Sequence, residues 1–242
     1  MTDKRKIVSA VGSAAGTSHV VAVPAATFVP TTRQIDGGDQ CWSQVQEWAM
    51  LEDNQQLASD PLSLTLSEVL ANTQPFPAGE LRCFRGVAFP EGLVPEPSNM
   101  GPPPDRRMAA PGRYNAEGHR VLYLSGSLDG VTREVKPGLN NTWLQSYTLR
   151  CDRLRIADFR PPVKPLVNHV FWWTETASED RGTRFLFSQF VADLVEQFFD
   201  GMIVPGVRGD GSLQYFNVVV FRPNEYWRDW LTEGSMPKRL SA

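Results

Sequence analysis

Seven prolines fall within the 22 residues from Pro90 to Pro111. Each proline removes a backbone hydrogen-bond donor and fixes its own φ angle, so this stretch can be neither a regular helix nor a central strand. We therefore expect a long loop or flap here. Such a loop could cover a pocket, contact a partner or be a surface segment without a function of its own.

Apolar residues in the rest of the chain recur at helical or strand spacing. The clearest pattern runs from Phe187 to Phe199, where apolar side chains follow the i, i+3, i+4, i+7 spacing of one helical face. It predicts a helix that buries a phenylalanine-rich stripe. Shorter patterns predict helices over 42–51, 61–70 and 128–135, and strands over 81–86, 121–124, 143–156, 202–204 and 216–221. The predicted fold class is α+β.

Prolines and glycines between these patterns divide the chain into three predicted segments. Residues 1–78 are expected to be an N-terminal arm followed by short helices. Residues 79–225 are expected to form the main α+β domain. Residues 226–242 are expected to be a C-terminal tail.

Composition excludes several functional classes. With 242 residues, 41% of them hydrophobic, the chain can bury a full core. Its formal net charge of -3 provides no positive surface for a phosphate backbone, so direct nucleic-acid binding is not expected. No apolar run approaches the roughly 18 to 20 residues that a membrane span needs. The mean hydropathy of -0.29 agrees with the resulting prediction of a soluble protein without membrane contact.

The cysteines and the N-terminus indicate the compartment. Cys41, Cys83 and Cys151 are odd in number and far apart, which argues against a disulfide framework and favours a reducing environment. Residues 4–6 are basic like the start of a signal peptide, but the stretch from Gly12 onward breaks the apolar run that export requires. We therefore expect a cytoplasmic protein.

Neither a metal site nor a carboxylate pair is expected. The histidines lie far apart and have no cysteine close by in the sequence: His19, His119 and His169. Glu175, Glu179 and Asp180 follow an aromatic run. Because no opposing carboxylate can be placed from the sequence, we interpret these three as a solvated acidic turn beside the end of a buried aromatic strand.

One segment combines the residue types that suit a nucleotide-sugar bond. Arg113 lies in a turn beside a glycine, Tyr123 in the next strand, and Glu134 in the helix that follows. Arginine offers a planar set of donors for phosphate, tyrosine an aromatic face with a polar end, and glutamate a charge that can stabilise developing positive charge. On spacing alone, the alternative is a structural ion pair between Arg113 and Glu134 beside a core Tyr123.

A series of fragments in this order resembles the RES domain over about residues 80 to 223. The fragments are Phe84-Arg85-Gly86, Gly112-Arg113-Tyr114-Asn115, Val121-Leu122-Tyr123-Leu124, Arg133-Glu134, Ser188-Gln189-Phe190, the run from Asp200 to Pro205, and Asn217-Val218-Val219-Val220-Phe221. The resemblance implies a fold similar to that of ADP-ribosyltransferases. Members of this family are typically toxins of bacterial Xre-RES toxin-antitoxin pairs that attack NAD+ by hydrolysis, by phosphorolysis or by ADP-ribosyl transfer to a protein.

The resemblance also implies roles for matched residues. Arg85 and Arg113 would bind the phosphates of NAD+ or neighbouring groups. Tyr123 would pack against the nicotinamide end. Glu134 would hold the nicotinamide ribose and stabilise the oxocarbenium-like state as the N-glycosidic bond breaks. Tyr114 would line the same pocket or serve as a core or capping residue.

The chain departs from the family at Gly206, because the resemblance implies a serine at this position. Ser212 lies six residues further on and could approach the site only if the intervening loop folds back. Three alternatives follow. The protein catalyses the same reaction more slowly, it transfers ADP-ribose to a different acceptor, or it has lost catalytic activity.

We therefore predict a RES-type toxin that cleaves the nicotinamide-ribose bond of NAD+ as a glycohydrolase or phosphorylase, without a metal. The resemblance implies an Xre-type antitoxin that blocks the NAD+ pocket, and self-association. The alternatives are an ADP-ribosyltransferase that modifies a protein, and a domain with weakened catalytic activity that binds NAD+ or a partner.

Overall fold

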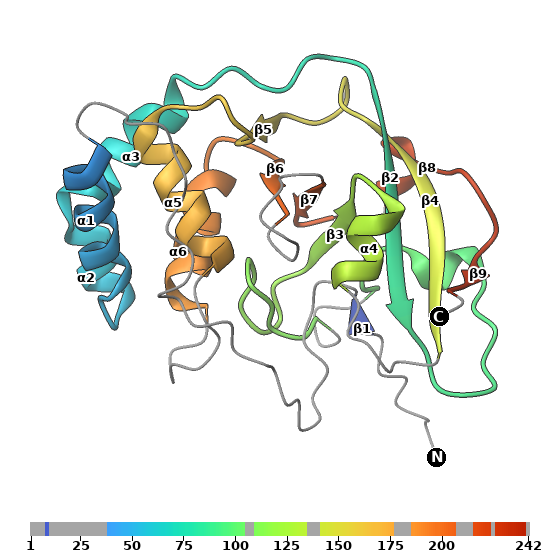
Figure 1. Cartoon of the computed structure of the whole chain (residues 1–242). Helices are drawn as coiled ribbons and strands as arrows, with labels where there is room; N and C mark the ends of the chain where they lie inside the picture. Colours follow the sequence, from blue (N-terminus) through green and yellow to red (C-terminus); the bar gives the residue numbers. More distant parts are fainter. Residues whose placement is uncertain are drawn as a thin grey trace.

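The computed structural model describes residues 8–9, 38–104, 109–134, 141–176, 185–206, 215–223 and 226–240. Its strands are β1 (Val8–Ser9), β2 (Glu80–Ala88), β3 (Val121–Ser125), β4 (Thr142–Arg150), β5 (Ile156–Asp158), β6 (Gly201–Pro205), β7 (Phe216–Phe221), β8 (Leu231–Glu233) and β9 (Lys238–Arg239). They form one sheet in the order β5-β6-β7-β3-β2-β4-β8, with β1 beside β2 and β9 beside β4 (Figure 1). The β5 and β6 strands are parallel, and the other described pairs are antiparallel.

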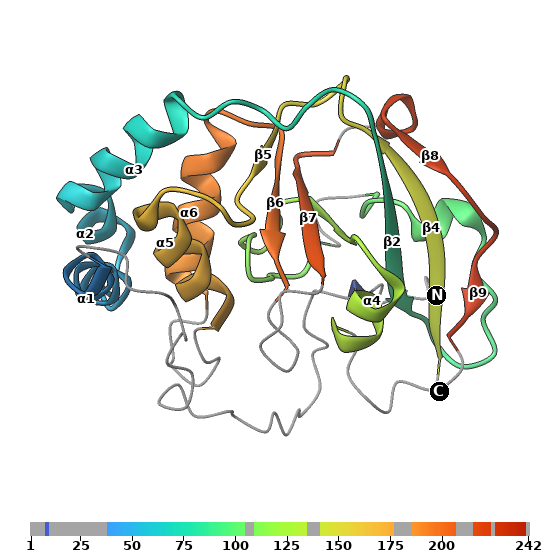
Figure 2. The ribbon, with the colours of Figure 1, turned by 45° about the horizontal axis from the view of Figure 1, so that its top comes forward.

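The helices of the described residues are α1 (Gly38–Ala49), α2 (Asn54–Ser59), α3 (Pro61–Ala71), α4 (Leu128–Glu134), α5 (Pro165–Thr176) and α6 (Leu186–Glu196). Two short 3-10 helices, η2 (Pro97–Met100) and η4 (Trp227–Asp229), lie in connecting segments. Helices α5 and α6 pack on the sheet at β6, and α1, α2 and α3 lie outside them (Figure 2). The predicted α+β class is confirmed.

The sheet has two buried faces. Directly opposed residues of neighbouring antiparallel strands point to the same side, so the pairs Tyr123 with Val219 and Ser125 with Asn217 share one face. This helix face packs against α5 and α6 in one hydrophobic cluster. The other side, the loop face, carries alternate residues such as Leu124 and packs in a second cluster against segments that contain η2 and η4.

The predicted helix from Phe187 is confirmed as α6, which buries apolar side chains along one face. The predicted aromatic strand end around Phe171 is wrong, because these residues belong to α5. Val167, Val170, Phe171 and Thr174 are all buried and recur at i, i+3, i+4 and i+7, which is helical spacing. The proline-rich segment is irregular apart from η2, as its missing backbone donors require.

The chain before and after the central strands also contributes to the core. Trp48 of α1 packs edge-on against Phe187 of α6, with ring centroids 4.9 Å apart. Strands β8 and β9, which lie in the predicted C-terminal tail, pair with β4 and so belong to the sheet. Of the predicted N-terminal arm, the described residues include β1 and the start of α1. Within the described ranges, no helix has the length and apolar character needed to cross a membrane.

Candidate functional site

Glu134, the last residue of α4, is a buried carboxylate with two identified donors. Its side chain is 8% exposed. The hydroxyl of Tyr215 donates to Oε1 at 3.1 Å, and Nδ2 of Asn217 donates to the same oxygen at 2.9 Å. Hydrogen bonds to a charged carboxylate are stronger than those between neutral groups. The arrangement therefore fixes a negative charge above the sheet.

Local geometry brings this carboxylate to the helix face. Helix α4 begins directly after β3, and Ser127 caps its first turn through a 3.0 Å hydrogen bond from the amide of Gly130 to Oγ. The helix packs over β2 and β3 (Figure 1). Asn217 reaches the same side from β7, where it is the cross-strand partner of Ser125.

Gly206 belongs to this group of residues. It follows β6, is buried, and its amide donates to the carbonyl of Tyr215 at 2.9 Å. A Cβ atom at Gly206 would overlap the ring of Tyr215, so a serine does not fit here while the ring keeps its position. Ser212, the more distant alternative, lies outside the described residues.

Tyr123 and Tyr114 form a second group on the same sheet face. The hydroxyl of Tyr123 donates to Oδ1 of Asn115 at 2.8 Å and accepts from the amide of Tyr114 at 3.0 Å. The hydroxyl of Tyr114 lies 3.1 Å from Oγ1 of Thr174 in α5. Tyr114 and Tyr123 are 2% and 4% exposed, so both lie in the core as well as beside the candidate site.

Arg113 projects from the same turn, at the end of α5. Its Nη1 donates to the carbonyl of Thr174, and its guanidinium lies 5.6 Å from the centroid of the Phe185 ring. Gln189 of α6 donates to the carbonyls of Gly112 and Asn115, each at 2.9 Å. The turn that carries Arg113 is thus fastened to two helices, which places a positive charge at a defined position.

The two groups are neighbours. Tyr123 and Ser125 are two residues apart on β3 and point to the same face, which separates their Cα atoms by about 7 Å. The structure therefore brings Arg113, Tyr114 and Tyr123 together in one group, beside the group of Glu134 and Gly206.

Arg85 is not part of either group. It is the cross-strand partner of Gln145 on the loop face, whereas Phe84 pairs with Ser125 on the helix face. Arg85 is 1% exposed, and its Nη1 donates to the carbonyl of Gly101 at 2.6 Å. Among the described residues, no atom accepts a hydrogen bond from its Nε or Nη2. Burial lowers the pKa of this guanidinium to about 10.

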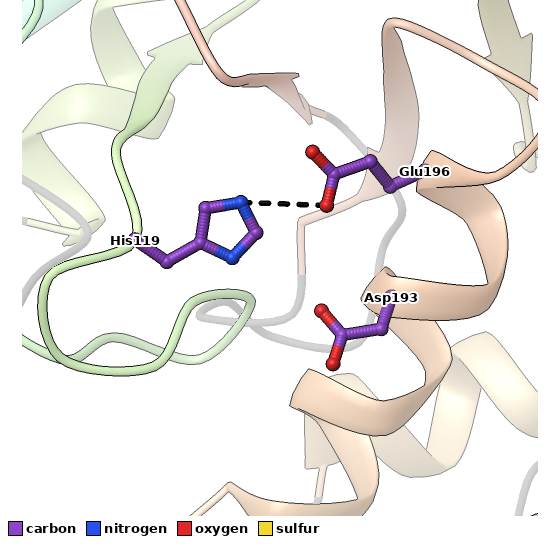
Figure 3. Close-up of side chains that lie close together, drawn as sticks. All are labelled: His119, Asp193 and Glu196. Atoms are coloured by element: carbon purple, nitrogen blue, oxygen red, sulfur yellow. Dashed lines mark ion pairs between the residues drawn. The ribbon is translucent and has the colours of Figure 1, made fainter.

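A third cluster, at the other end of β3, contains groups that could ligate a metal. His119 precedes β3, and Asp193 and Glu196 lie one turn apart on α6, with ligand atoms within 4.8 Å of one another (Figure 3). His119 Nε2 lies 3.3 Å from Glu196, which also forms an ion pair with Arg222. Burial raises the pKa of Asp193. Because Arg222 already provides a cation, we interpret the cluster as ion pairing that fastens α6 to the start of β3.

The sequence interpretation missed this cluster, since its members are far apart in the chain. It also missed Tyr215 and Asn217 as site residues. A signal for Asn217 does exist: it is the only polar residue of β7, and a buried polar side chain in an apolar strand requires a partner. For Tyr215 the sequence carries no comparable signal. The side chains of Glu175, Glu179 and Asp180 lie outside the described part of the structure.

Comparison with known proteins identifies one family. Residues 94–228, more than half of the chain, match the RES domain. This span includes Arg113, Tyr114, Tyr123, Glu134 and Gly206 but not Arg85. No curated protein and no solved structure matches the chain, so the likeness to ADP-ribosyltransferases stays a prediction.

Proposed function

Because the chain belongs to the RES domain family, we propose that it cleaves the bond between nicotinamide and ribose in NAD+. The observation that supports this proposal most directly is the buried carboxylate of Glu134, held at one oxygen by two donors. Cleavage of this bond releases neutral nicotinamide and leaves positive charge at C1′ of the ribose. A fixed carboxylate near C1′ stabilises that charge mainly in the transition state, and so accelerates the reaction.

Water or phosphate then attacks C1′ and loses a proton to solvent, which gives ADP-ribose or its 1-phosphate. Burial of Glu134 strengthens its interaction with the ribose, because electrostatic attraction grows as the local dielectric falls. This scheme requires neither a redox step nor a metal ion.

Arg113 binds the diphosphate of NAD+ in this proposal. A guanidinium has five donor hydrogens in a planar fork that matches phosphate oxygens, and the contact with Thr174 involves Nη1. Tyr123 and Tyr114 act as positioning residues, because their hydroxyls hold the turn on which Arg113 lies. Arg85 has no part in the reaction, since it lies on the loop face.

Nicotinamide release from NAD+, with and without phosphate, tests the proposal. We expect wild-type protein to release nicotinamide and Glu134→Gln to lose at least about 100-fold in rate, the scale seen when a transition-state charge loses its partner. Glu91→Gln, an exposed carboxylate in a loop, is the matched control and should keep the wild-type rate.

The acceptor follows from the same assay. Release that requires phosphate identifies a phosphorylase, and release in water a glycohydrolase. ADP-ribose label that stays on protein identifies a transferase. NAD+ binding without release by the wild type overturns the proposal in favour of a binding module.

The resemblance alone supports three further proposals: an Xre-type antitoxin as partner, self-association, and a cytoplasmic location. Light scattering of the purified chain tests self-association. Protection of NAD+ when an Xre-type protein is added tests the proposed partner.

A further inference from the structure

The ring of Tyr215 occupies a slot lined by two glycines. A Cβ atom at Gly206 would overlap Cε2, Cδ2 and Cζ of this ring. A Cβ atom at Gly130 in α4 would lie 2.6 Å from Cδ2 of the same ring and would overlap Oγ of Ser125. Real Cβ atoms do not approach other atoms so closely. Position 206 therefore excludes any side chain while the ring is present, and at position 130 Oγ of Ser125 as well as the ring excludes one.

The slot directs the polar end of Tyr215 toward Glu134. Tyr215 is 4% exposed, and its hydroxyl donates to Oε1 of Glu134. The backbone on the strand side is also fixed, because the amide of Gly206 donates to the carbonyl of Tyr215. A ring packed this closely against its neighbours has little rotational freedom, so its hydroxyl is already positioned at the carboxylate.

We propose that Tyr215 is the positioning residue for the Glu134 carboxylate, and that residue 206 is a glycine because a side chain there would overlap the ring of Tyr215. The inference rests on the cleavage of NAD+ proposed above for the role of the carboxylate. It accounts for Gly206, because a serine there would overlap the ring whose hydroxyl donates to Glu134.

The first experiment removes the hydroxyl and keeps the ring. We expect Tyr215→Phe to lower kcat about tenfold or more with KM little changed, because a hydrogen bond to a charged group is lost. Tyr226→Phe, at a tyrosine that is 63% exposed, is the matched control. A wild-type kcat for Tyr215→Phe would overturn the proposal.

The second experiment tests the slot. Gly206→Ser should lower the denaturant midpoint strongly in the wild-type background and equally in Tyr215→Phe, because the ring is present in both. In Tyr215→Ala the same substitution should have little effect, because the ring is gone. Equal loss in all three backgrounds, or no loss in any, would contradict the steric argument.

A third measurement does not depend on activity. A double-mutant cycle between Tyr215→Phe and Glu134→Ala, followed by urea unfolding, should give a coupling of about tenfold in the unfolding equilibrium constant. If wild-type protein fails to release nicotinamide while this coupling is found, the proposed function fails and the positioning contact stands. Additive effects in the cycle would overturn the positioning role whatever the activity.

Discussion

Glu134 and Arg85 are both buried charged side chains close to the same sheet, yet their surroundings differ. Glu134, on the helix face, receives hydrogen bonds from a tyrosine and an asparagine that approach from another part of the chain. Arg85, on the loop face, donates to a single carbonyl, and the described residues provide no acceptor for its Nε and Nη2. Burial by itself therefore does not distinguish Glu134 from Arg85. What distinguishes Glu134 is that other residues are arranged around it.

The largest expected difference between the two charges is in catalysis. Glu134→Gln should reduce nicotinamide release at least about 100-fold, whereas Arg85→Met should leave the rate within about threefold of wild type. Both variants should keep the wild-type circular dichroism spectrum. If Arg85→Met lost as much activity as Glu134→Gln and remained folded, Arg85 would belong to the reaction and the distinction between the faces would fail.

Tyr123 extends the comparison to a neutral group on the helix face. Its hydroxyl is used as donor and acceptor, so Tyr123→Phe leaves the buried amide of Tyr114 without this acceptor. We expect a loss of about 1–3 kcal/mol in the free energy of unfolding, measured by urea denaturation. Tyr226→Phe, at an exposed site, should change it by less than about 0.5 kcal/mol. Equal values for the two variants would show that the Tyr123 contacts do not stabilise the fold.

For Arg85 the expected change in stability is smaller. Arg85→Met removes a buried charge and a single hydrogen bond to Gly101 and retains most of the apolar volume. These effects oppose each other, so the free energy of unfolding should change by no more than about 1 kcal/mol. A loss several times larger would mean that the guanidinium has a strong partner on the loop face.

The smallest effect concerns His169 of α5, which packs against Trp42 with ring centroids 5.4 Å apart. Burial lowers the pKa of this histidine in the folded protein below the 6.5 of an exposed side chain. The unfolded chain therefore takes up a proton first as pH falls, and the folded state loses stability below about pH 6.5. His169→Phe should show a smaller loss between about pH 7.5 and about pH 5.5. An equal loss in both proteins would assign this pH dependence to other groups.

Strong periodicity made much of the fold predictable. The apolar stripe of α6 and the apolar run of β7 indicated the correct element type, because each packs against the core along its whole length. The run around Phe171 misled because consecutive aromatic residues suggest a strand, although the buried positions follow helical spacing. Here the packing against α1 and the sheet decided the conformation, not the local preference of the residues.

The candidate site could be predicted in part. Arg113, Tyr123 and Glu134 stand out because charged and aromatic residues cluster in a short segment. The donors of Glu134 could not be found this way, since Tyr215 and Asn217 meet it only through the pairing of β3 with β7. The reason for a glycine at position 206 could not be predicted either. The overlap with Tyr215 that excludes a serine is a contact between residues that are not adjacent in the sequence.

The hydrogen bonds that hold Glu134 join residues 81 and 83 positions apart. During synthesis the ribosome releases α4 long before it releases β7, so the carboxylate first emerges into water without either donor. Contacts of such high sequence separation form late, because the long loop between them must close first. The nascent chain can therefore fold local helices early, but it acquires the held carboxylate only when Tyr215 and β7 have been made and docked.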